Sequence, residues 1–123
     1  MRQEIKNSAQ GPVEVSVDAG QQRFQFAGDF IGFSGHFPDY PILPAVLQTL
    51  LAQMVAEQMV GEPLQFLALE RAKFTKQLGP GDQIDVSVIC KDKLGQLSCS
   101  AELSVAKKRA ASFTLLLGKG TEQ

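Results

Sequence analysis

Residues 35–47 read GHFPDYPILPAVL, and this stretch holds the chain's single histidine, His36, and three of its six prolines. Prolines at positions 38, 41 and 44 keep the backbone extended and stiff, because proline fixes φ and disfavours the helical conformation of the residue before it. Pro44 suits the first turn of a helix, where its missing N–H loses no hydrogen bond. We therefore expect a rigid loop that leads into a helix and holds the His36 imidazole in a fixed place.

A long helix is predicted from Pro44 to about Val60. Its residues are strong helix formers, and Gly61 and Pro63 follow as stop signals. Polar residues interrupt the stretch, so we predict a buried helix and not a membrane span. The apolar side chains recur at helical spacing, at Val46, Leu47, Leu50, Leu51, Met54 and Val55.

The remaining sequence has the pattern of β-strands. Alternating residues and turn signals predict two strands before the helix and four after it. One helix against an antiparallel sheet is an α+β design. The predicted strands cover residues 12–18, 23–26, 65–77, 84–90, 97–105 and 110–117.

No linker or repeat divides the chain, and 123 residues with 44% hydrophobic residues suffice for one domain with its own core. We expect an N-terminal extension over residues 1–11, a single domain over residues 12–118 and a tail over residues 119–123. Twelve basic residues against thirteen acidic ones argue against broad binding to nucleic acid or to an anionic membrane. The N-terminus has no apolar segment typical of a secretory signal, which predicts a cytoplasmic protein.

Cys90 and Cys99 lack the spacing of metal ligands, and no second histidine is available to join them. We therefore predict no metal site. The two cysteines fall on neighbouring predicted strands joined by a short turn, where they could be cross-strand neighbours. Free thiols in a reducing cytoplasm are the expectation, and a disulfide or redox pair is the alternative.

The loop and helix resemble the 3-hydroxyacyl-acyl-carrier-protein dehydratase family of hotdog-fold proteins. Members carry Gly-His-Phe-Pro and further prolines ahead of a long central helix. Residues 71–74, 80–83 and 111–113 resemble later strands and turns of the family, so the resemblance covers about residues 12–118. The residues that match the motif in order and spacing are Gly35, His36, Phe37, Pro38, Pro41, Pro44, Val46 and Leu47.

The resemblance implies a hotdog fold, a homodimer or dimer-based oligomer with sheets joined edge to edge, and an acyl tunnel shared by both protomers. His36 matches the catalytic histidine, which acts as base on the α-carbon of the substrate. The backbone N–H of Ala45 matches the amide that holds the thioester carbonyl. The implied substrate is an acyl thioester of an acyl carrier protein or coenzyme A, in fatty acid biosynthesis and without a cofactor. The expected substrate-binding residues are Gly35, Phe37, Pro44, Ala45, Val46, Gln48, Leu50, Gln53 and Met54.

The chain departs from the family at the second catalytic position. The family's helix carboxylate falls on Leu50, and its helical glutamine falls on Met54. Leucine cannot protonate a leaving hydroxyl, and general acid–base assistance is typically worth about 10² to 10⁴ in rate. Ala45 replaces a glycine, and its methyl group narrows the approach to the thioester.

Substitutes for the missing acid are few. Glu57 lies nearly two turns from Leu50, roughly 10 Å along the helix axis, so it is too far to replace it directly; a solvated or helix-end carboxylate is its ordinary role. Asp39 could reach back to His36 or cap a turn. Three neutral residues flank position 50 and could place a water molecule without supplying a proton: Gln48, Thr49 and Gln53.

Two functions stay open. The first is an enzyme that acts on acyl thioesters, either a divergent 3-hydroxyacyl dehydratase or a related hotdog thioesterase. The second is a non-catalytic acyl-binding or partner subunit, and a heterodimer whose partner supplies the acid lies between them. A set of basic residues could contact an acidic carrier protein or a coenzyme A phosphate, or simply lie solvated at strand ends: Arg71, Lys73, Lys76, Lys107, Lys108 and Arg109.

Overall fold

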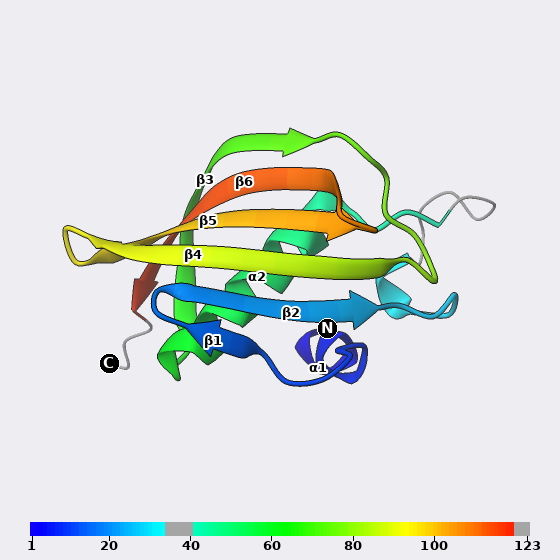
Figure 1. Cartoon of the computed structure of the whole chain (residues 1–123), viewed down its shortest axis with the longest axis horizontal. Helices are drawn as coiled ribbons and strands as arrows, with labels where there is room; N and C mark the ends of the chain where they lie inside the picture. Colours follow the sequence, from blue (N-terminus) through cyan, green and yellow to red (C-terminus); the bar gives the residue numbers. More distant parts are fainter. Residues whose placement is uncertain (34–40, 120–123) are drawn as a thin grey trace.

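The computed structural model describes residues 1–33 and 41–119, and Figure 1 shows a curved antiparallel sheet laid over one long helix. Because the helix packs against one face of the sheet, the predicted α+β hotdog fold is confirmed. The elements are α1 (Arg2–Asn7), β1 (Glu14–Ser16), β2 (Ala19–Gln25), η1 (Ile31–Phe33), α2 (Ala45–Val60), β3 (Leu64–Phe74), β4 (Gln83–Lys93), β5 (Gln96–Val105) and β6 (Lys108–Lys119).

The sheet has six strands in the order β1-β2-β4-β5-β6-β3, with every pair antiparallel. Alternate residues of β4 point toward α2 and are buried, as the period of a half-buried strand requires. Ile84, Val86 and Val88 have no exposed surface, and neither do Leu51 and Val55 of α2. The core therefore lies between the helix and the middle of the sheet.

Helix α2 begins and ends where the sequence predicts. Pro44 precedes it in an extended conformation, and Gly61 ends it in the left-handed region at φ 78°. The Gly61 N–H donates to the Glu57 carbonyl at 2.8 Å and closes the last turn. The predicted start and stop signals therefore mark the two ends of the observed helix.

The burial of α2 differs from the predicted apolar face. Val46 is 71% exposed, whereas the polar side chains Gln48, Thr49 and Gln53 are buried. Each buried polar side chain donates to a backbone carbonyl, and such pairing offsets the loss of water. The buried face of α2 therefore includes polar side chains as well as apolar ones.

The N-terminal segment contributes to the packing of the fold. Helix α1 places Ile5 in the core with no exposed surface, and Ala9 forms an isolated bridge with Phe24. The Gln10 N–H donates to the Arg23 carbonyl at 2.7 Å, and the Gln25 N–H donates to the Ser8 carbonyl at 3.0 Å. Residues 1–11 consequently pack beside β2, although the sequence pattern predicts no element there.

Strand β3 forms the edge of the sheet opposite β1 (Figure 1). Within the described residues it pairs only with β6, and its ladder is interrupted between Phe66 and Ala68 and again between Glu70 and Lys73. An edge strand leaves one row of backbone groups without sheet partners. Leu64 at its start is buried, but four of its large hydrophobic side chains are 40% to 48% exposed: Phe66, Leu67, Leu69 and Phe74.

Candidate active site

The N-terminus of α2 presents free backbone donors. The N–H groups of Leu47 and Gln48 both donate to the Pro44 carbonyl, at 3.0 and 3.1 Å. Among the described residues, the N–H groups of Ala45 and Val46 have no acceptor. Such donors at a helix start carry partial positive charge and favour an anion or a polarised carbonyl oxygen.

A cavity of about 400 Å³ lies beside this helix start. It is bordered by Pro44, Ala45 and Gln48 on one side and by the segment that follows β3 on the other. The Leu43 N–H donates to the Leu78 carbonyl at 2.7 Å, which joins the two segments. Lys76, one of the basic residues that the sequence pointed to, borders the cavity as well. The sequence did not point to the other lining residues as binding residues: Ile42, Leu43, Phe74, Thr75 and Gln77.

Gln48 anchors the junction between loop and helix. Its side chain is 4% exposed, and its Nε2 donates to the Leu43 carbonyl at 3.0 Å. Its Oε1 is buried and has no donor within the part of the chain that the structure describes. A buried acceptor without a partner costs about 1–3 kcal/mol, so a donor that reached this oxygen would stabilise the junction.

The other predicted helix residues lie apart from this cavity. Leu50 is partly buried and packs on the core, while Gln53 donates to the Leu64 carbonyl at 2.9 Å. Met54 borders a second, larger cavity near the C-terminal half of α2. Gly35, His36, Phe37 and Asp39 fall outside the described residues, so their roles stay predictions.

Glu57 is the one acidic residue of α2, and its carboxylate already has several partners. Both oxygens accept from the Arg2 guanidinium, and Oε2 also accepts from the Leu64 N–H at 3.0 Å. The Glu57 side chain is only 13% exposed. It therefore ties α1 and the start of β3 to the helix end, in place of the solvated carboxylate that the sequence suggested.

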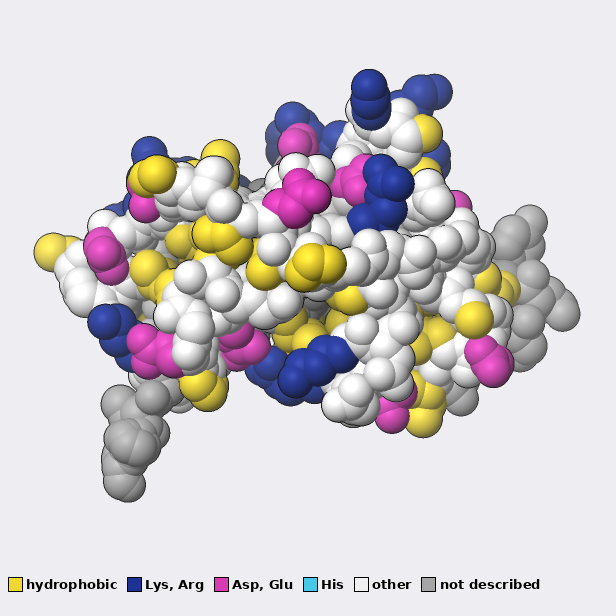
Figure 2. All heavy atoms as spheres, turned by 60° about the horizontal axis from the view of Figure 1, so that its bottom comes forward, with side chains coloured by type: hydrophobic (Ala, Val, Ile, Leu, Met, Phe, Trp, Pro, Cys, Tyr) yellow, Lys and Arg dark blue, Asp and Glu magenta, His cyan; other side chains and the backbone are white. Residues whose placement is uncertain are grey.

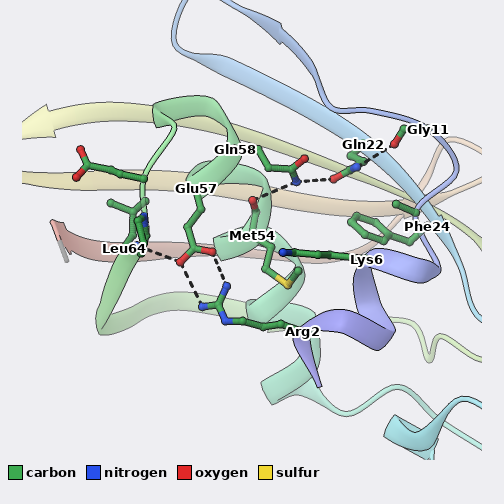
Figure 3. A pocket seen from close by; sticks show the side chains of 12 residues that line it. Arg2, Lys6, Gly11, Gln22, Phe24, Met54, Glu57, Gln58 and Leu64 are labelled. Carbon is green, nitrogen blue, oxygen red and sulfur yellow. Dashed lines mark hydrogen bonds and ion pairs between the residues drawn. The ribbon is translucent and has the colours of Figure 1, made fainter.

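The second cavity has a volume of about 830 Å³ and is drawn in Figure 3. Polar groups on its wall bond to one another: Gln58 donates to Gln22, and Gln22 donates to the Gly11 carbonyl, both at 2.9 Å. The Arg2–Glu57 ion pair lies on the same wall. These contacts tie together α1, β2 and α2, and none of them involves the donors at Ala45.

The surface has mixed charge. On the face shown in Figure 2, acidic and basic side chains are interspersed, with hydrophobic side chains between them. Across residues 1–33 and 41–119, no group of three His, Cys, Asp or Glu side chains is arranged to hold a metal ion. Within those same residues, no helix has the length and apolar character needed to cross a membrane.

The fold is that of a hotdog protein, and a family model assigns the chain to the dehydratase class. The model of the ApeI-like family, described as ApeI dehydratase, matches residues 13–114. The chain belongs to this family, which confirms the resemblance seen in the sequence.

Similar proteins agree with this assignment. The chain is 35% identical over 96 residues to the 3-hydroxyacyl-[acyl-carrier-protein] dehydratase FabZ of Streptococcus suis, covering 72% of this chain and 69% of that protein. It is 39% identical over 92 residues to FabZ of Thermotoga maritima, covering 70% and 66%. Among solved structures, the dehydratase heterocomplex ApeI:P from Xenorhabdus doucetiae matches with a TM-score of 0.75 and 21% identity, covering 90% of this chain and 96% of that one.

Proposed function

We propose that this protein is a 3-hydroxyacyl-thioester dehydratase subunit that supplies the catalytic base and lacks the usual acid. The observation that carries the proposal is the pair of N–H donors at Ala45 and Val46, which have no acceptor among the described residues and lie at the helix start that borders a cavity, after the family's histidine segment. A thioester carbonyl placed on these donors is polarised, which acidifies its α-carbon. The role proposed for it is in the making of fatty-acid-type chains in the cytoplasm.

In the proposed reaction, His36 removes the proton from the α-carbon while the Ala45 N–H holds the thioester oxygen. The 3-hydroxyl group then leaves as water, which requires a proton at the hydroxyl oxygen. Gly35 and Phe37 flank the base, and Pro44, Val46 and Gln48 shape the entrance. Leu50, Gln53 and Met54 are proposed to line the path of the acyl chain.

The chain has leucine where the family has its helix carboxylate, so the acid must come from elsewhere. Leu50 occupies the position of the family's carboxylate, and Glu57 already bonds Arg2 and the Leu64 N–H. We propose that a second hotdog chain, carrying a carboxylate on its own helix, supplies the acid in an assembly whose site is shared between protomers. The similar structure from Xenorhabdus doucetiae is a dehydratase heterocomplex, which supports this arrangement.

Leu50 also favours a second candidate, a non-catalytic acyl-binding subunit. The dehydratase subunit is expected to convert 3-hydroxyacyl and 2-enoyl thioesters into each other, whereas the binding subunit is expected only to bind them. Purified protein is incubated with 3-hydroxyacyl and 2-enoyl thioesters of acyl carrier protein and of coenzyme A, and hydration and hydrolysis are followed separately. The dehydratase proposal predicts slow, reversible hydration that rises when a chain with the helix acid is added. Saturable binding of an acyl-pantetheine without turnover under both conditions supports the binding subunit, and hydrolysis alone indicates a thioesterase.

The free edge of β3 is the proposed site of assembly. Its unpaired backbone groups and exposed hydrophobic side chains fit a second sheet edge, which adds hydrogen bonds and buries apolar surface. We expect a homodimer when the chain is alone. When the acid-bearing chain is also present, we expect it to take the place of one copy and to pair edge to edge with the other.

The double variant Phe66→Lys/Leu69→Lys is expected to convert this dimer to a monomer, because it puts two like charges on each of two facing edges. Light scattering coupled to size-exclusion chromatography should give twice 13.3 kDa for the wild type and 13.3 kDa for the variant. Leu94→Lys is the matched control, since Leu94 is 98% exposed in the β4–β5 turn. A monomeric wild type, or a variant that stays dimeric, would refute the assignment of the interface.

A further inference from the structure

Cys90 and Cys99 are two buried thiols that the proposed dehydration does not use. They stand directly opposite each other on β4 and β5, which confirms that they are cross-strand neighbours. Cys90 is 6% exposed and Cys99 has no exposed surface. Both are free thiols in the structure.

The backbone places this pair at a position suited to a disulfide. The Cys90 N–H donates to the Asp18 carbonyl at 2.8 Å, so it points toward β2 and away from β5. The N–H and C=O of one strand residue point to the same side, which makes Cys90 and Cys99 a non-hydrogen-bonded pair. Opposite Cα atoms at such pairs lie about 4.5 Å apart, within the range of roughly 4.4–6.8 Å seen for disulfides.

The two thiols have different reactivity. The Cys99 thiol lowers the pKa of Cys90 by hydrogen bonding to its sulfur, and this effect exceeds the opposing effects of burial and of the Asp18 carboxylate. The pKa of Cys99 is raised by the neighbouring Cys90 sulfur and by burial. Cys90 also keeps a little exposed surface whereas Cys99 has none, so Cys90 is the thiol that we expect to react as the nucleophile.

We propose that Cys90 and Cys99 form a site of reversible oxidation by peroxides, which closes to a disulfide within one chain. The Cys90 thiolate attacks one peroxide oxygen, the O–O bond breaks, and Cys90 becomes a sulfenic acid as hydroxide leaves. The Cys99 sulfur then attacks the Cys90 sulfur, the S–O bond breaks and the S–S bond forms. In sum, two thiols and one hydrogen peroxide give one disulfide and two waters, and a dithiol reductant reverses the change.

The disulfide would link β4 to β5 on the buried face of the sheet, near the turn that joins the two strands. A crosslink across a short loop restricts the unfolded chain, and we expect the melting temperature to rise by roughly 5 °C. This consequence does not depend on the proposed function, because neither cysteine borders the cavity at the start of α2.

The test treats the folded full chain with a small excess of hydrogen peroxide, followed by mass spectrometry and thiol counting after denaturation. The wild type should lose about 2 Da and both thiols, give a peptide that links positions 90 and 99, and recover with dithiothreitol. Cys99→Ser should instead gain about 16 Da per oxygen at Cys90, and Cys90→Ser should stay unmodified at the same dose.

Three outcomes would overturn the inference: a wild type that keeps both thiols, one that gains oxygen without losing 2 Da, or one that forms disulfides between chains. Melting curves of both serine variants are recorded under reducing conditions. They establish that the variants are folded before their reactions with peroxide are compared with that of the wild type.

Discussion

Leu50→Glu is expected to raise the rate of 3-hydroxyacyl-thioester dehydration by about 10²-fold, because a positioned general acid is typically worth about 10² to 10⁴. The new carboxyl would lie in the second turn of α2, beyond the free donors at Ala45. Leu50 is only partly buried, so its replacement does not place a carboxyl in the deep core. The rates of dehydration and of the reverse hydration are measured for both proteins with the same thioester.

Leu50→Gln is the matched control for this gain. Glutamine has nearly the shape of glutamate and can place a water molecule, but it does not donate an acidic proton. We expect it to give much less activity than Leu50→Glu. Equal rates for the two variants, at similar melting temperatures, would contradict the view that an acid is what position 50 lacks.

His36→Ala is expected to lower turnover by about 10² to 10⁴, both in the wild type and in the Leu50→Glu variant. His36 is the only histidine among 123 residues, so no other imidazole of the chain can replace it. The measurement is kcat/KM for dehydration, combined with the affinity for a non-hydrolysable acyl-pantetheine. Loss of turnover with binding retained identifies a base, whereas a structural role would weaken both.

Asp39→Asn is the control within the same loop. It changes a charge three residues from His36, and the proposal gives Asp39 no part in proton transfer. We expect its turnover to stay within a few-fold of the wild type. If Asp39→Asn removes activity and His36→Ala does not, the assignment of the base is wrong.

Most of the fold could be predicted because its signals are local. Pro44 and Gly61 mark the two ends of α2, and turn residues separate the strands that follow. The buried glutamines of α2 could not be predicted, since their amides bond carbonyls of the Leu43 and Leu64 backbone. Such bonds depend on tertiary structure and leave no trace in the periodicity of polar and apolar residues.

Less of the candidate site could be predicted. The motif pointed to Ala45 and Gln48, which the structure places at one cavity. The opposite wall comes from residues about thirty positions later that the Leu43–Leu78 hydrogen bond brings close, and of these the sequence pointed only to Lys76. The role of Glu57 in holding α1 was also missed, because its partner Arg2 lies in a segment with no strand pattern.

The central claim is that this chain carries a base and no acid in a site shared by two protomers. The most direct test mixes the wild type with the double variant His36→Ala/Leu50→Glu, refolds them together and measures dehydration against each protein alone. One chain then supplies the base and the other the acid, so the account predicts that the mixture far exceeds the sum of its parts. Mixed dimers that form and show no gain would contradict it.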